Sequence, residues 1–334
     1  MARSPESAAS PPTGPQGDAG RQGVVVDVAG LPVAILGCGA VGSLFAVDLA
    51  GVGAVPLLWS RTEGRAEDLA SRIFGAKCFP RPEEAIATAA VTLLCVADQA
   101  LERFSAELAV LAGEPGPEHA CLHTNGARGL GVLAPLEARG FGVGKLHPLI
   151  AVPPTSAAGP SALSGRFRGA WFASLGRGSG EAWARRLVGV LGAHRLQLAD
   201  DGDESSIRLH AAAALLSGGF VAVYDLALEA AEEVATLAGE DDRQGGAGAA
   251  LTTLLASTVS NLARHGTRDA LTGPVARGSL EVVRAHLETL SGDAREAYQV
   301  LGRRMLALSL ARGGVDAVVA QKLATLLGTD DQEA

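Results

Sequence analysis

Three glycines in the stretch Val33–Ala46 are spaced as in a turn that binds a nucleotide. The stretch reads VAILGCGAVGSLFA, so an apolar segment leads through Gly37, Gly39 and Gly42 into a helical pattern. The first glycine permits a tight turn, the second lets the backbone approach a pyrophosphate, and the third lets a helix pack closely on a strand. The diphosphate then lies at the positive end of the helix. We predict that the dinucleotide contacts Gly37, Gly39, Ala40, Val41 and Gly42.

The residues after the next expected strand indicate which dinucleotide fits. A domain that binds NAD usually has Asp or Glu about 20 residues after the first glycine, where it binds the ribose 2′-hydroxyl. Here the segment reads Leu-Trp-Ser-Arg-Thr and has no acid. Ser60, Arg61 and Thr62 can instead receive a 2′-phosphate. We therefore predict NADP as the cofactor, and the alternative is that Arg61 is a solvated turn residue.

Two further strand ends are expected at the same crevice of a doubly wound sheet. Val96 and Ala97 end one strand and are predicted to pass over the cofactor ribose. Thr124 and Asn125 end another, near the nicotinamide. The Asn125 amide can orient a substrate oxygen, but an ordinary Asn-Gly turn explains the residue equally well.

Two histidines are candidates for substrate binding and proton transfer. His147 ends a strand, where it either lines a substrate pocket or is a structural histidine. His210 lies near the start of a long helix, followed by four alanines that allow close approach of another element. An imidazole titrates near neutral pH and suits a proton donor. We predict that His210 donates the proton, and that Ser217, near the same face of the helix, contacts the substrate. The alternative is a hydrogen-bonded histidine at a domain junction.

A polar loop in the second half of the chain, 270–278, reads ALTGPVARG. Its Arg277 can reach an anionic substrate or a partner subunit. A helix-capping turn with a solvated arginine is the alternative.

Strands and helices must alternate to position these residues. Apolar strands are expected at the following ranges: Val33–Leu36, Val55–Trp59, Val91–Val96, Ala120–His123, Gly142–Leu146, Ala170–Leu175 and Arg195–Leu198. Helical patterns fall between most of them, which predicts a mainly parallel, Rossmann-type sheet covered on both faces, over residues 31–200. The later strands can add an antiparallel edge.

The remainder, residues 203–328, shows helical patterns only. The pattern over Glu204–Ala238 is nearly continuous, and Gly218-Gly219 in its middle favours a kink or a close approach. Its apolar residues cover more than one face, so it needs neighbours on most sides. We predict an all-helical second domain that forms a homodimer.

Composition excludes several classes of protein. The net charge is −8, without a basic block, which argues against nucleic-acid binding. The four cysteines show no metal-binding spacing, and no metal site is expected. Residues 1–23 are expected to be a disordered tail without the features of a targeting signal. The apolar run Ala211–Tyr224 is judged too short to span a bilayer, so we expect a cytoplasmic protein without membrane contact.

These segments together resemble known families. The stretch from Val33 to Arg61 is similar to the NADP-binding half of ketopantoate reductase. A closer resemblance, over about residues 31–311, is to a bacterial family that joins a Rossmann-like domain to a helical C-terminal domain of unknown function. It rests on the segments LHTNGA (122–127), LHPL (146–149), LHAAA (209–213) and ALTGPVARG (270–278).

This resemblance implies a fold related to the 6-phosphogluconate-dehydrogenase-like NADP oxidoreductases, with a helical domain of that kind, but not a substrate. Ketopantoate reductase needs a lysine on its interdomain helix, and Glu204–Ala238 contains none. The hypothesis is an NADP-dependent oxidoreductase that acts on a small carbonyl, hydroxy acid or imine in the cleft between the domains. The alternative is a non-catalytic sensor or regulatory protein that binds NADP(H).

Overall fold

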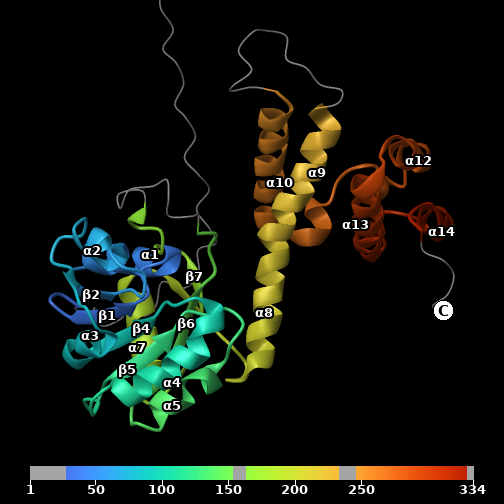
Figure 1. The fold of residues 1–334 in the computed structure, drawn as a ribbon. Coiled ribbons are helices and arrows are strands. Elements are labelled where there is room, and N and C mark those ends of the chain that lie inside the picture. Colours follow the sequence, from blue (N-terminus) through green and yellow to red (C-terminus); the bar gives the residue numbers. More distant parts are fainter. Residues whose placement is uncertain (1–27, 153–162, 233–245, 329–334) are drawn as a thin grey trace, which may run out of the picture. The chain divides into compact units, whose positions relative to one another are not determined.

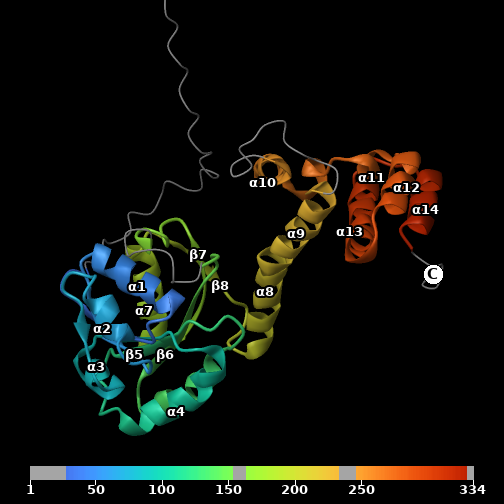
Figure 2. The same cartoon turned by 45° about the horizontal axis from the view of Figure 1, so that its top comes forward.

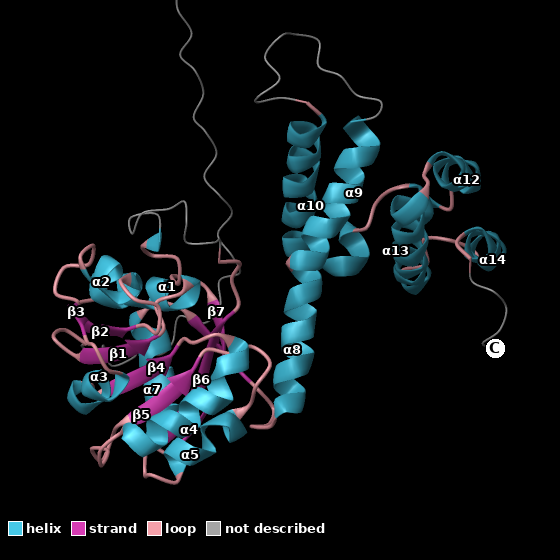
Figure 3. Cartoon of the chain, viewed as in Figure 1, coloured by secondary structure: helices cyan, strands magenta, loops and turns pink. Residues whose placement is uncertain are grey.

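The structure is a computed structural model, and it describes residues 28–152, 163–232 and 246–328. The chain divides into two compact units, Met1–Ala211 and Ala212–Ala334. The first holds a sheet with helices, and the second is helical (Figures 1 and 3). The predicted tail, residues 1–23, and the predicted end of the long helix, residues 233–238, lie outside the described residues.

The first unit is built on one eight-stranded sheet with the order β3-β2-β1-β4-β5-β6-β7-β8. Strands β1 to β6 are mutually parallel, whereas β7 is antiparallel to β6 and parallel to β8. The strands are β1 Pro32–Leu36, β2 Val55–Trp59, β3 Lys77–Cys78, β4 Val91–Leu94, β5 Ala120–His123, β6 Gly142–Pro148, β7 Trp171–Arg177 and β8 His194–Gln197.

Helices cover both faces of this sheet, because its strands are apolar on both sides. Val33 and Ile35 of β1 pack in the core with α1 and α7, whereas Ala34 and Leu36 pack on the other side with α3 and α4. Figure 2 gives a second view of these layers. The helices are α1 Ala40–Gly51, α2 Arg65–Ala70, α3 Pro82–Thr88, η1 Asp98–Ala100, α4 Leu101–Leu111, η2 Leu130–Leu133, α5 Ala134–Glu137 and α7 Ser179–Val190.

The second unit contains helices only among its described residues. The helix α8, Asp203–Leu216, begins in the first unit and ends in the second. The helices that follow are α9 Gly218–Glu232, α10 Ala247–Ala270, α11 Pro274–Arg277, α12 Leu280–Thr289, α13 Gly292–Ala311 and α14 Ala317–Leu326. Apolar residues of α11 to α14 form one core. The parallel sheet followed by an all-helical domain confirms the predicted fold class.

Two local features differ from the predictions. The short edge strand β3 was missed because its two residues, one exposed and one partly buried, give no apolar run. The loop expected at 270–278 contains one turn of helix, α11, which Pro274 begins and which buries Val275 and Ala276. Proline is favoured at the first position of a helix, where its missing N–H is not needed.

The helical stretch Asp203–Ala231 is apolar and largely exposed. By length and composition it is long enough to cross a bilayer, and its most apolar window has no buried residue. The expectation that no segment is long enough was therefore wrong, because the helical stretch extends beyond the apolar run that was counted. A single helix of this kind is weak evidence for a membrane segment, because the core helix of a soluble protein meets the same criteria.

Asp48 offers a test of how the first unit is held together. This α1 side chain is buried, and its carboxylate accepts hydrogen bonds from the backbone N–H groups of Gly165 and Phe167. Asp48→Ala leaves two N–H donors without that acceptor and should cost about 3 kcal/mol in the free energy of unfolding, measured with urea. Glu63→Ala, at an exposed turn, is the control. A loss no larger than that of the control would contradict this role.

Candidate functional site

The three glycines of the β1–α1 turn each meet a different steric demand. Gly37 has a φ of +111°, and a Cβ there would lie 2.5 Å from the carbonyl oxygen of Cys95. A Cβ on Gly42 would lie only 1.9 Å from the carbonyl oxygen of Gly37. A Cβ on Gly39, by contrast, would meet no atom within 4 Å. The turn is therefore tightly packed on its inner side and open at Gly39, as approach by a ligand requires.

The first turn of α1 is free to bind an anion. Gly39 is its N-cap, and no side chain caps the helix. The N–H groups of a first helical turn have no partner within the helix and carry the positive end of the helix dipole. An anion placed there gains both hydrogen bonds and electrostatic stabilisation.

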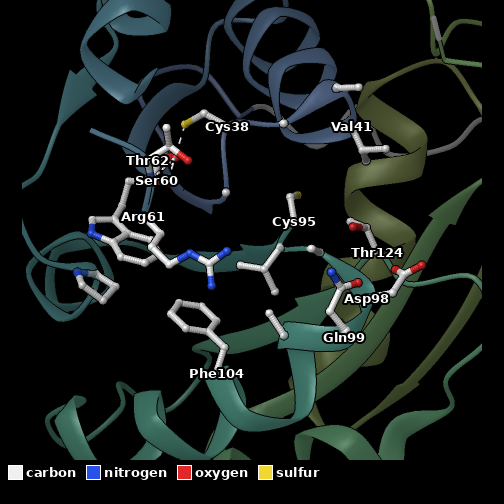
Figure 4. Close-up of a pocket in the computed structure, with 18 of the residues that line it drawn as sticks. Cys38, Val41, Ser60, Arg61, Thr62, Cys95, Asp98, Gln99, Phe104 and Thr124 are labelled. Carbon is white, nitrogen blue, oxygen red and sulfur yellow. Dashed lines mark hydrogen bonds between the residues drawn. The ribbon is translucent and has the colours of Figure 1, made fainter. Parts of the chain in front are cut away.

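One pocket of about 1030 Å³ runs along the carboxyl ends of the parallel strands (Figure 4). This is the edge where doubly wound sheets bind nucleotides. Its lining includes the predicted residues Gly37, Gly39, Ala40, Val41, Ser60, Arg61, Thr62, Val96, Ala97, Thr124, His147 and His210.

Basic and aromatic groups gather at the end of the pocket that follows β2. Arg61 is exposed, forms no ion pair with any described residue, and directs its guanidinium into the pocket on the side where Phe104 lies (Figure 4). Trp59 and Phe104 stack with ring centroids 5.3 Å apart. Arg103 also lines the pocket but pairs with Glu107 at 2.6 Å. Arg65 lines the same pocket and likewise forms no ion pair with a described residue, so Arg61 and Arg65 are both available to an added phosphate.

Asn125 makes local hydrogen bonds rather than lining the pocket. Its Oδ1 accepts from the backbone N–H groups of Ala127 and Arg128 at 2.8 and 2.9 Å. Its Nδ2 donates to Asp98 at 2.6 Å. The carbonyl end of the amide is thus occupied in a turn, which leaves one amide hydrogen for any other partner. Asp98 itself lines the pocket.

His147 is placed and oriented by the end of β5. Its Nδ1 lies 2.8 Å from the Thr124 carbonyl oxygen, which can only accept a hydrogen bond, so Nδ1 carries the proton. Burial lowers the pKa of His147, and the cationic Lys145 adds to that effect. A neutral ring with hydrogen on Nδ1 has an acceptor at Nε2. His147, which lines the pocket, therefore offers a neutral hydrogen-bond acceptor.

His210 lies beside His147, with Gly126 against both rings. The ring centroids are 5.5 Å apart and the ring planes nearly perpendicular, at 77°. A Cβ on Gly126 would lie 2.2 Å from Nδ1 of His210 and 2.9 Å from Cε1 of His147. Nδ1 of His210 is buried and has no hydrogen-bond partner among the described residues. The contact with Gly126 thus brings the two imidazoles together at one end of the pocket.

The other two predicted substrate residues belong to the second unit. The Ser217 hydroxyl donates to the Ala213 carbonyl oxygen at 2.8 Å, one helical turn back. Arg277 is exposed at the end of α11. Neither lines the pocket of the first unit, and their part in binding stays a prediction.

Two residues of this region, Gly126 and Lys145, were not predicted as site residues. Gly126 was interpreted only as part of an Asn-Gly turn, and no sequence pattern reveals that two rings pack on it. Lys145 is fully buried beside the site. A signal was present, since Lys145 is one of only three lysines and stands within an apolar strand.

The fold is that of a Rossmann-like domain followed by a helical second domain. Residues 15–148 match the family described as a Rossmann-like domain, and residues 171–305 match a domain of unknown function, DUF2520. The chain therefore carries both of these domains, one after the other. No curated protein matches it by sequence.

Solved structures share this fold over most of its length. An NADP oxidoreductase, so named provisionally, from Bacteroides fragilis has 20% identity and a TM-score of 0.63, covering 83% of this chain and 98% of that one. A Thermotoga maritima protein has 19% identity and a TM-score of 0.59, covering 84% and 99%. A reductive aminase from Aspergillus terreus, in complex with NADPH and ethyl levulinate, has 19% identity and a TM-score of 0.51, covering 90% and 93%. At these identities the likeness establishes the fold.

The packing of Gly126 gives a direct test of the histidine pair. Gly126→Ala should separate the rings, because a methyl group cannot fit against both. The nitrogen resonances of His147 and His210 should then shift in an NMR spectrum of protein with labelled histidine. Gly131→Ala is the matched control, because its Cβ would meet no atom within 4 Å. Unchanged resonances in Gly126→Ala would contradict the described geometry.

Proposed function

We propose that this protein is an NADP-dependent oxidoreductase. The observation that carries the proposal is one continuous pocket with an uncapped helix start and a glycine turn, an unpaired arginine at one end, and two imidazoles near the other. Bound NADPH would supply a hydride. The complex of the Aspergillus terreus reductive aminase with NADPH, on the same fold, supports the choice of cofactor.

The two imidazoles suit the proton transfer that accompanies hydride transfer. His210 is proposed to donate the proton to the substrate oxygen or nitrogen as it becomes negative or basic. His147, with its acceptor Nε2, is proposed to hold a hydroxyl, amine or protonated imine of the substrate. Asn125 is proposed to act mainly by shaping the loop that carries Gly126, since its oxygen is already bonded within the turn.

This chemistry fits a small carbonyl compound, hydroxy acid or imine as the substrate. The pocket wall near the histidines includes the apolar residues Pro148, Ile150 and Val152. An apolar wall with a few convergent polar groups is typical of a site for a small organic molecule.

The cofactor proposal predicts a preference that depends on Arg61. NADPH should bind about thirtyfold more tightly than NADH, about 2 kcal/mol, if Arg61 forms charge-assisted hydrogen bonds with the 2′-phosphate. Arg61→Ala should remove most of this preference and leave NADH affinity nearly unchanged. Quenching of protein fluorescence measures both affinities. Equal affinities in the unmutated protein would refute the choice of NADP.

The proton donor is tested by His210→Ala. Turnover of a panel of keto acids and imines, followed by NADPH absorbance, should fall about a hundredfold while NADPH affinity stays the same. His194→Ala is the control, because that histidine is exposed at the start of β8. Full turnover in His210→Ala would make this imidazole structural. Tight NADPH binding without turnover of any substrate would instead favour the sensor hypothesis.

We further propose that the protein is a cytoplasmic homodimer that associates through its helical domain. Within the second unit α9 packs on α10, and the Tyr224 hydroxyl donates to the Gly248 carbonyl oxygen at 2.8 Å. Large apolar side chains remain exposed at the end of α8 and along α9 and α10. They are Leu215, Leu216, Phe220, Val221, Val223, Leu254, Val259 and Leu262. A second copy covering this surface would explain it without a membrane.

Light scattering in aqueous buffer tests this assembly at micromolar concentration. We expect twice the mass of one 33.8 kDa chain. Val221→Asp, which places a charge on the exposed surface, should shift the mass toward one chain. A single-chain mass for the unmutated protein would contradict the dimer, and a requirement for detergent would favour membrane contact.

A further inference from the structure

The side chain of Lys145 is fully buried on β6, and its three ammonium hydrogens have three acceptors. Nζ donates to the carbonyl oxygens of Gly126 and Arg128 at 2.8 and 3.0 Å, and to the Ser206 hydroxyl at 2.7 Å. Burying an ammonium group is costly unless its donors are satisfied. Here each donor has a partner, and the partners belong to the 126–130 loop and to α8.

The same loop is held from several directions. His123, which pairs with Lys145 in the sheet register, has Nε2 3.1 Å from the Gly129 carbonyl oxygen. The N–H of Gly129 donates to the Asp203 carboxylate at 2.7 Å, and the N–H of Leu130 donates to the Asp201 carbonyl oxygen at 2.9 Å. The loop therefore joins β5 and β6 to the beginning of α8 through hydrogen bonds on both sides.

Lys145 and His147 share one face of β6, because residues two apart in a strand point the same way. Ser206 and His210 share one face of α8, because residues four apart in a helix lie one turn above each other. Lys145 contacts Ser206, and His147 contacts His210. Gly126 lies between the two contacts, since Lys145 bonds its carbonyl oxygen and both imidazoles pack on its Cα.

We propose that Lys145 is a positioning residue of the site, which fixes α8 through Ser206 so that His210 stays against His147 and Gly126. A slip of α8 by one residue would turn it by about 100° and move it by about 1.5 Å along its axis, carrying His210 away from the pocket. The bond to Ser206, one turn before His210, prevents that slip. The role of His210 as proton donor rests on the proposed function, whereas its positioning by Lys145 and Ser206 does not.

The charge of Lys145 also acts on the neighbouring rings. Burial lowers the pKa of Lys145 to about 8, an effect that Asp203 partly offsets, so the group is mainly charged at neutral pH. Burial, followed by the Lys145 charge, lowers the pKa of His123 to about 3. Burial and the Lys145 charge also lower the pKa of His147. The hydrogen bond to the Thr124 carbonyl and the charge of Asp98 oppose this shift without cancelling it. Removing the Lys145 charge should therefore raise the pKa of His147.

The experiment uses the full-length protein with labelled histidine, and NMR follows the ring resonances of His147 and His210 against pH. Ser206→Ala removes the acceptor on α8 and keeps the ammonium group. Ser205→Ala is the matched control, because that hydroxyl donates to Asp200 instead of Lys145. Lys145→Met removes the charge and the three donors while keeping a long side chain. Resonances of the sheet report whether each variant keeps the fold.

We expect Ser206→Ala and Lys145→Met to shift the resonances of both rings, and Ser205→Ala to leave them unchanged. Lys145→Met alone should also raise the pKa of His147. Where turnover is measurable, kcat in Ser206→Ala should fall about tenfold or more with NADPH affinity unchanged. Unshifted rings in a folded Ser206→Ala variant would overturn the proposal. If Lys145→Met does not fold, the result with Ser206→Ala still tests the positioning role of Lys145. The NMR measurement needs no turnover, so it tests this role even if the protein proves not to be an oxidoreductase.

Discussion

The buried ammonium group of Lys145 is the interaction on which the histidine end of the pocket depends. An ammonium group in the sheet interior must satisfy all its donors, and here the 126–130 loop and the beginning of α8 supply three acceptors. That requirement draws three separate segments of the chain to one point. Gly126 then fits between two imidazoles that lie 63 positions apart in the sequence, at 147 and 210.

The other end of the pocket follows from simpler constraints. A parallel sheet places the carboxyl ends of β1, β2, β4 and β5 at one edge, so Gly39, Arg61, Ala97 and Thr124 meet there without special contacts. The glycine spacing makes the turn tight on its inner side and open on its outer side. The proposed binding surface for a dinucleotide thus follows from the local sequence, whereas the histidine pair depends on the tertiary structure.

This difference explains what the sequence could predict. Apolar runs bounded by turns located seven strands, and the glycine turn and Arg61 were found from local spacing. For Asn125 the sequence left a turn and a substrate contact equally open, and the bond to Asp98, 27 positions away, is evident only after folding. Lys145 was missed as a site residue because a sequence does not show which buried side chain meets which backbone oxygen. His210 was predicted because its residue type suits proton transfer. Its contact with His147 could not be predicted, because that contact depends on how α8 packs against the 126–130 loop.

A co-crystal structure with NADPH tests the central claim most directly, namely that one pocket joins a cofactor site to a pair of histidines. We predict that the diphosphate lies on the first turn of α1, that the 2′-phosphate contacts Arg61, and that the nicotinamide ring faces His147 and His210. A cofactor bound away from the Gly37–Gly42 turn would contradict the assignment of the pocket. A nicotinamide ring directed away from both histidines would contradict their role in the chemistry.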